Sequence, residues 1–227
     1  MRETTIKIDL HVHTKASGDS FIDLKDAIKT VKNIGLDGLA ITDHDTIEDA
    51  LIAANMKTEI IIIPGIEVSA IEGHILGIGI TEEIPRGLTA KETVEKIREL
   101  GGLAVVPHPF DFLRHGVGEK VARQINPDAI ESINSNSALF YYEKRLSEKL
   151  AEKIQKPQTA GSDAHMLSSI GRAYTMVETK STDIESILES IKVGKTKPVG
   201  KPTSVRTKIN NSLKILVEDY RKLVSLT

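Results

Sequence analysis

Short apolar runs with a period of two residues alternate along this chain with stretches in which apolar residues recur every three or four positions. The first pattern is typical of β-strands and the second of amphipathic helices. The predicted strands are Thr5–Leu10, Gly38–Ile41, Ile60–Ile66, Ile75–Ile80, Leu103–Val106, Ala129–Ser132, Thr159–Gly161 and Ala173–Val177. Seven or eight strands separated by helices are typical of a single α/β barrel.

Start and stop residues support several of the intervening helices. Asp23 is expected to cap a helix over Leu24–Asn33, and Gly35 is expected to end it in a left-handed turn. A longer helix is predicted over Tyr141–Ile154. The other signals are capping-box spacings and glycine stops, at Thr89 with Glu92, Thr182 with Glu185, Gly101 and Gly194.

The pattern changes after the last predicted strand. Residues 194–204, GKTKPVGKPTS, have no apolar period and predict a linker. Residues 205–227 predict a helix whose apolar face is formed by Ile209, Leu213, Leu216, Tyr220 and Leu223. We expect this face to pack on the barrel, with an oligomer contact as the alternative. The predicted organisation is a barrel over residues 1–193, a linker and a C-terminal helix.

Composition and charge narrow the possible chemistry. The 227 residues include no cysteine, which excludes disulfides, thiolate metal sites and thiol nucleophiles. A formal net charge of −2 gives no overall attraction to duplex nucleic acid. The first residues lack the apolar stretch of a secretory signal, and no segment approaches about 18 uninterrupted apolar residues. We therefore expect a cytoplasmic protein that does not bind membranes.

Histidines gather at the predicted strand ends. Six of the seven stand beside a strand end or beside another acid or imidazole. His11 and His13 follow the first strand with one residue between them, so that an extended backbone points both rings to the same side. A single pair of this kind is more often a solvent-facing or hydrogen-bonded pair than a metal site. Support from other strands is therefore needed.

Later strands repeat this pattern. His44 follows the second strand and His108 follows the strand Leu103–Val106. Glu67 ends an apolar run where an unpaired carboxylate would be costly to bury, although a surface position past the strand end is an equal alternative. The short strand Thr159–Gly161 is followed by Asp163 and His165. His74 begins a strand, so only a bend after the third strand would bring it to the same rim.

The carboxyl ends of parallel barrel strands open on one face, where these side chains can converge. Imidazoles and carboxylates at one rim are compatible when cations neutralise them. The set therefore predicts a metal site. Nitrogen and oxygen ligands suit Mn, Fe, Zn or Co, and the sequence does not choose among these metals.

Five ordered motifs resemble the PHP (polymerase and histidinol phosphatase) family, within the wider amidohydrolase group. They are DLHVHT, GLDGLAITDHDT, PGIEVSA followed by GHILGIG, VVPHPFD and AGSDAH. The resemblance covers about Ile6 to Glu178, and five motifs in order make it specific. It implies an α/β fold of the distorted (β/α)7 TIM-like barrel type with two or three divalent ions of Zn, Mn or Fe.

The resemblance also implies the metal ligands. A first ion would be held by His11, His13, Glu67 and Asp163. A second ion, bridged by Glu67, would be held also by His74 and His108, and a third by Asp19, His44 and His165. Many relatives have Ser-Asp-Gly after the His-x-His-Thr, whereas this chain has Ser17-Gly18-Asp19-Ser20. The carboxylate comes one residue late, and without Asp19 the site would be dinuclear.

The predicted activity is hydrolysis of phosphate esters by a hydroxide that bridges two metals. Arg114 and His115 are the candidate catalytic residues, with His115 able to protonate the leaving oxygen. Lys15, Arg114 and Arg172 are the candidate phosphate-binding residues, each with a solvated charge as its alternative role. The remaining candidates are Asp43 and Asp45, which could orient an imidazole, and Asn134 and Asn136, which could face the pocket or form a turn.

Several functions stay open at this point. The expected partner is a small phosphorylated metabolite or a nucleotide. A single-strand nuclease with the same metals would need an aromatic, basic groove, and the chain has only four Tyr, four Phe and no Trp. A non-catalytic binding barrel and hydrolysis of a C–N bond are further alternatives. The sequence does not decide between a monoester and a diester, or between a monomer and a homo-oligomer.

Overall fold

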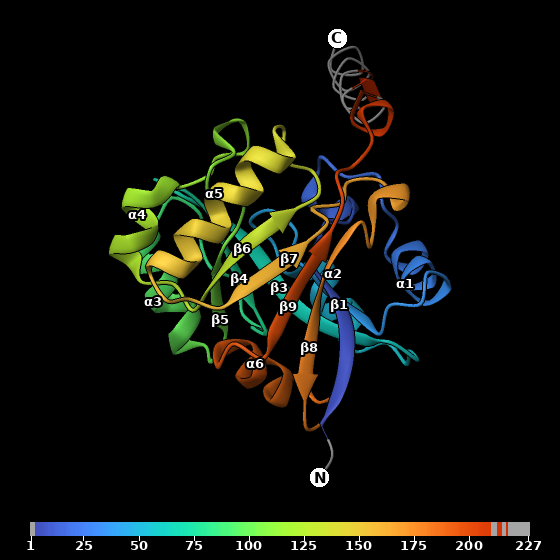
Figure 1. The fold of residues 1–227 in the computed structure, drawn as a ribbon. Coiled ribbons are helices and arrows are strands. Elements are labelled where there is room, and N and C mark those ends of the chain that lie inside the picture. Colours follow the sequence, from blue (N-terminus) through green and yellow to red (C-terminus); the bar gives the residue numbers. More distant parts are fainter. Residues whose placement is uncertain (1–2, 210–212, 215–216, 218–227) are drawn as a thin grey trace.

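A sheet of seven strands curls into a nearly closed barrel at the centre of the molecule (Figure 1). The computed structural model describes residues 3–209, 213, 214 and 217. In chain order the strands are β1 (Thr4–Val12), β2 (Gly38–Ile41), β3 (Ile61–Ala70), β4 (Gly73–Ile78), β5 (Leu103–Val106), β6 (Ala129–Asn134) and β7 (Gln158–Gly161). Each strand pairs with the next. The predicted distorted (β/α)7 barrel is confirmed.

The barrel closes at the carboxyl ends of β7 and β1. The backbone N–H of Asp163 donates to the carbonyl of His11 at 2.8 Å, and that of His13 donates to the carbonyl of Ala164 at 3.1 Å. These bonds continue the parallel pairing just past the end of β7. They bring the motifs AGSDAH and DLHVHT side by side, although more than a hundred residues separate them in the chain.

One strand runs against the others. β4 is antiparallel to both β3 and β5, whereas the other neighbours within the barrel are parallel. His74 lies at the start of β4 and opposite Ser69 of β3. The β3–β4 hairpin therefore supplies the expected bend, because the start of an antiparallel strand lies at the rim where its neighbours end.

Two further strands extend the sheet. β8 (Ala173–Thr179) pairs antiparallel with the first half of β1, and β9 (Thr196–Gly200) pairs with β8 at the sheet edge. The predicted linker over residues 194–204 is therefore wrong. An edge strand tolerates Pro198 and Gly200, and because every residue of β9 is at least partly exposed, its sequence lacks the apolar period of a core strand.

In the described chain before residue 205, six α-helices lie outside the barrel or cover one end of it (Figure 1). They are α1 (Leu24–Asn33), α2 (Glu48–Ala54), α3 (Ala90–Glu99), α4 (Gly118–Ile125), α5 (Phe140–Lys153) and α6 (Ile184–Lys192). Asp23 caps α1, and Thr89 with Glu92 forms a capping box on α3, as predicted. The box predicted from Thr182 is wrong by one residue, because Asp183 caps α6.

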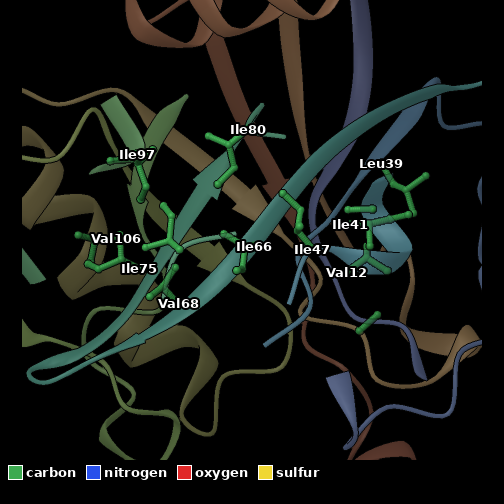
Figure 2. Close-up of a cluster of buried hydrophobic side chains, with 14 of the residues drawn as sticks. Val12, Leu39, Ile41, Ile47, Ile66, Val68, Ile75, Ile80, Ile97 and Val106 are labelled. Carbon is green, nitrogen blue, oxygen red and sulfur yellow. The ribbon is translucent and has the colours of Figure 1, made fainter. Parts of the chain in front are cut away.

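Both faces of the barrel strands are buried, which explains their continuous apolar runs. Leu39 and Ile41 of β2 belong to a cluster that includes side chains of α1 to α4, part of which Figure 2 shows. Ala40, between them, faces a second cluster that includes Ile187 and Ile191 of α6. Polar side chains are therefore tolerated mainly where the strands end.

The chain after β9 differs from the prediction of a docked helix. Residues 205–209 are helical, but Ile209 and Leu213 are each 54% exposed, so this part of the apolar face is not buried on the barrel. Leu216, Tyr220 and Leu223 lie outside the described residues. None of the helices in the described part of the chain is long and apolar enough to cross a membrane.

Candidate metal centre

Five imidazoles surround the carboxylate of Glu67, which is 1% exposed. Its Oε2 atom lies 3.1 Å from His11 Nε2, 3.2 Å from His13 Nε2 and 3.4 Å from His44 Nδ1. Its Oε1 atom lies 3.0 Å from His74 Nδ1 and 3.1 Å from His108 Nε2. Each oxygen of one buried carboxylate thus faces its own set of imidazole nitrogens.

Hydrogen bonds alone do not account for this packing. The Nε2 atoms of His11 and His13 lie 3.0 Å apart, so their two lone pairs would repel unless a proton or a cation lies between them. Asp19 Oδ1 is buried without a hydrogen-bond partner among the described residues. Positive ions shared by these atoms would satisfy the arrangement, so the donor set fits divalent metals.

The donor atoms form four overlapping groups whose members lie within 4.8 Å of one another. The groups are His13, Asp19, His44 and His165; His11, His13 and Asp163; His11, Glu67 and His108; and His44, Glu67 and His74. The structure therefore brings together all nine residues predicted as ligands. Their sets of nitrogen and oxygen atoms suit Zn, Mn or Fe.

Unusual backbone angles turn these side chains inward. His108 and Asp163 have φ angles of 29° and 51°, in a region that non-glycine residues rarely adopt. Each is the second residue after a strand end, so the chain bends sharply at the rim. Such strained positions concentrate at functional sites, where the surrounding structure holds them.

Asp19 reaches the centre from the loop after β1. Gly18 precedes it with a φ angle of 82°. The Oδ2 atom of Asp19 lies 3.0 Å from His165 Nε2 and 3.7 Å from His44 Nε2. The late position of this carboxylate in the motif is thus compensated by the left-handed turn at glycine.

Glu131 supports the centre and was missed by the sequence analysis. Its carboxylate is 2% exposed, lies 3.0 Å from His11 Nδ1, and accepts bonds from the backbone N–H of His108 and the side chain of Asn134. A carboxylate behind a ligating imidazole fixes the orientation of the ring. The sequence feature that could have indicated this role is a single Glu within a buried strand, where an unpaired charge has a high desolvation cost.

The two aspartates beside His44 anchor the backbone instead of orienting an imidazole. Asp43 accepts bonds from the N–H and the hydroxyl of Thr14, and Asp45 accepts a bond from the N–H of Ser69. They tie the ends of β1, β2 and β3 together. This differs from the predicted role because both carboxylates accept bonds from residues at the ends of neighbouring strands.

The charges of the centre depend on one another. Burial would raise the pKa of Glu67, but His11, His44 and His74 outweigh it and hold that pKa well below its usual range. Burial would lower the pKa of His13, but the carboxylates of Asp163 and Glu67 raise it to about 10. Without metal, the carboxylates stay ionised and retain protons on nearby imidazoles, so incoming cations would replace those protons.

A cavity of about 450 Å³ opens above these side chains. Arg114, His115 and Asn136 line it, as the sequence suggested. Lys15 and Arg172, predicted to bind phosphate, do not. Lys15 is 62% exposed and lies 3.8 Å from Asp23, and the guanidinium of Arg172 donates to the carbonyl of Pro202 at 2.9 Å. Lys15 follows the end of β1 and Arg172 directly precedes β8, and neither side chain lines the cavity.

Known proteins resemble this chain in sequence. The family model described as PHP-associated matches residues 142–196. The uncharacterized protein MJ1587 of Methanocaldococcus jannaschii is 35% identical over 142 residues, which cover 57% of this chain and 82% of that protein. The uncharacterized protein MJ0417 of the same organism is 32% identical over 177 residues, covering 74% of this chain and 69% of that protein.

Solved structures share the fold. A two-domain protein from Bacteroides vulgatus that contains a predicted PHP-like metal-dependent phosphoesterase superposes with a TM-score of 0.74 and 18% identity, over 88% of this chain and 66% of that one. The lesion-specific endonuclease PfuEndoQ from Pyrococcus furiosus superposes with a TM-score of 0.59 and 20% identity, over 86% of this chain and 58% of that one. This chain thus spans about two thirds or less of each.

The fold and the side chains at the carboxyl ends of its strands define an α/β barrel with a histidine- and carboxylate-rich centre suited to metal ions. The PHP-associated family model matches part of the chain, and the fold is shared with a protein that contains a predicted PHP-like metal-dependent phosphoesterase, so the chain is similar to the PHP family.

Proposed function

We propose that this protein is a metal-dependent phosphoesterase that hydrolyses a small phosphorylated metabolite or a nucleotide. The observation that supports this most strongly is the division of the Glu67 carboxylate. One oxygen faces His11, His13 and His44, and the other faces His74 and His108. A carboxylate with separate ligands at each oxygen is suited to bridge two cations.

The proposed ligand sets are those that the resemblance implies, and each shares at least two residues with a group of neighbouring donor atoms. The first ion would be held by His11, His13, Glu67 and Asp163, the second by Glu67, His74 and His108, and the third by Asp19, His44 and His165. Bound divalent ions would supply Lewis acidity and bring the pKa of a coordinated water toward about 7.

Two residues that line the cavity are the proposed direct contacts of the substrate. The guanidinium of Arg114 lies 3.7 Å from Asp163 and 3.3 Å from Asp111, at the wall of the cavity. From there it can donate to the non-bridging oxygens of a phosphate and stabilise the charge that develops on them. His115 also lines the cavity, and its carbonyl accepts the backbone N–H of His74 at 2.9 Å. Its ring can deliver a proton to the leaving oxygen.

Metal analysis coupled to a substrate panel tests the proposal. Purified protein is assayed for bound transition metals and then incubated with phosphate monoesters, phosphate diesters and a single-stranded oligonucleotide. The proposal expects two or three ions per chain and turnover of a small ester that is lost on chelation and restored by metal. Protein that takes up no metal would contradict it, and turnover of the oligonucleotide alone would favour a nuclease.

The structure separates Arg114 from the other predicted phosphate contacts. Arg114→Ala is expected to reduce kcat/KM by about 10²-fold, because a charged donor to the transition state is lost. Lys15→Ala serves as the matched control, because that side chain lies at the surface beside Asp23. Its kcat/KM is expected to stay within about twofold of the parent. Equal losses in the two variants would show that Arg114 has no special role.

Metal uptake is expected to release protons. Because the pKa of His13 is raised to about 10 in the metal-free centre, its ring carries a proton at neutral pH that a cation must displace. Apparent metal affinity should therefore rise as pH increases from about 6 to 9. Titration calorimetry in buffers of different ionisation enthalpy measures the proton count directly. A pH-independent affinity with no proton release would contradict the assigned protonation.

A further inference from the structure

The mouth of the cavity carries an apolar edge that phosphate binding does not explain. The 3-10 turn η2 (Phe112–Arg114) exposes two large apolar side chains next to the centre. Phe112 is 72% exposed and Leu113 is 82% exposed. Leu113 is the only apolar side chain among the described residues that line the cavity. Its neighbour in sequence is Arg114, the proposed phosphate contact.

The turn is held firmly despite this exposure. The backbone N–H groups of Arg114 and Gly116 both donate to the carbonyl of Asp111 at 3.0 Å. The Asp111 side chain is 2% exposed and accepts the backbone N–H of Ala138 at 2.9 Å. Leu113 is thus presented to solvent by an anchored turn, since the backbone around it is fixed by hydrogen bonds at both ends.

The bond between Asp111 and Ala138 also joins η2 to a second apolar segment. Leu139 follows Ala138 and is 64% exposed. Tyr141 and Tyr142, in the first turn of α5, are 76% and 63% exposed. Exposed apolar side chains at or near a cavity commonly mark a ligand-binding surface. We call Phe112, Leu113 and Leu139 the apolar rim.

We propose that the apolar rim binds an uncharged ring in the leaving group of the substrate, with Leu113 as the principal contact. This inference rests on the proposed phosphoesterase function. We infer the leaving group as the ligand of the rim from the position of Leu113, which lines the same cavity as Arg114 and the Glu67 carboxylate. A phosphoryl group held by the polar floor would extend its ester substituent outward, past Arg114 and onto the rim. An aromatic ring is suited to such a surface because it offers a flat apolar face.

Nonhydrolysable ligands separate phosphate binding from ring binding. Metal-loaded protein is titrated by calorimetry with methylphosphonate and with benzylphosphonate, which share the anion and differ in the ring. The parent protein is expected to bind benzylphosphonate about tenfold more tightly. Leu113→Ser should lose this preference while its affinity for methylphosphonate is unchanged. Val193→Ser is the matched control, because Val193 is 57% exposed and lies outside this cavity. It should keep the preference.

Hydrolysis supplies a second readout. Benzyl phosphate and ethyl phosphate both release an alcohol, so their comparison does not depend on an acidic phenol as leaving group. Leu113→Ser is expected to raise KM for benzyl phosphate by about tenfold with little change in kcat, because the ring contact is equal in ground state and transition state.

The outcomes distinguish the two proposals. If the parent binds both phosphonates equally, or if Leu113→Ser weakens both alike, the ring site is refuted while the phosphoesterase function stands. If metal-loaded protein binds neither phosphonate, both proposals are contradicted. A change of oligomeric state in Leu113→Ser, without a change in ring preference, would show that the rim is a protein interface and would refute the inference.

Discussion

Glu67→Ala is expected to lose at least one bound metal ion and to lower kcat/KM by on the order of 10³-fold or more. The carboxylate is shared by imidazoles on both of its oxygens, so its removal affects two proposed ion sites at once. No other side chain in the described centre lies beside five imidazoles. Metal content by mass spectrometry and turnover of the ester identified in the panel measure the two effects.

Glu67→Gln is the sharper form of the same test. It keeps the volume and one acceptor oxygen, so the pairing of this position with Leu76 across β3 and β4 is expected to be retained. A neutral amide cannot supply the bridging charge, and we expect the loss of metal to match that of the alanine variant. Circular dichroism and thermal unfolding check that both variants fold. Full metal content and unchanged turnover in a folded Glu67→Gln would remove the bridging role.

The barrel was predictable because its strands are apolar on both faces. A run such as Leu39–Ile41 is typical of a buried strand wherever it lies in the sequence, and β5 shares this property. The strand β9 was missed because its residues are only partly buried at an edge that accepts Pro198. The pattern of apolar residues indicates which strands are buried, so it does not predict a strand that is largely exposed.

The metal centre was predictable where metal-ligating side chains stand at the ends of predicted strands. His11, His44 and His108 follow apolar runs, and parallel strands carry their ends to one rim. Glu131 was missed because it lies within a strand, and the sequence does not say which face a single acid occupies. Lys15 and Arg172 do not line the cavity, for a related reason. Proximity to a strand end in sequence fixes the backbone but leaves the direction of a long side chain open.

A substitution at Gly161 is the second change for which we expect a large effect, because Gly161 lies where β7 contacts β1. A Cβ atom built at Gly161 would lie 2.3 Å from the Cβ of His11 and 2.7 Å from an oxygen of Glu131. These distances are far below any van der Waals contact, and the first involves an atom fixed to the backbone of β1. Gly161 therefore permits the close approach that pairs Asp163 with His11 across the closure of the barrel.

Gly161→Ala is expected to lower the free energy of unfolding by about 1–3 kcal/mol, because the two strands must separate to admit a methyl group. The same displacement moves His11 away from Glu67, so metal affinity should fall and kcat/KM should drop by about 10²-fold. Urea denaturation, metal analysis and steady-state kinetics measure these effects on one preparation.

Gly77→Ala separates the loss of stability from the loss of the centre. A Cβ atom at Gly77 would lie 3.1–3.4 Å from side-chain carbons of Ile97, Ile80 and Ile66, which can shift, and none of these belongs to the metal centre. This variant should be destabilised less than Gly161→Ala and should keep its metal and turnover. Overpacking can lower the stability of either variant. Of the two, we expect only Gly161→Ala to weaken metal binding as well, because Gly161 lies against His11. Full metal content in a folded Gly161→Ala would show that the centre tolerates separation of β7 from β1.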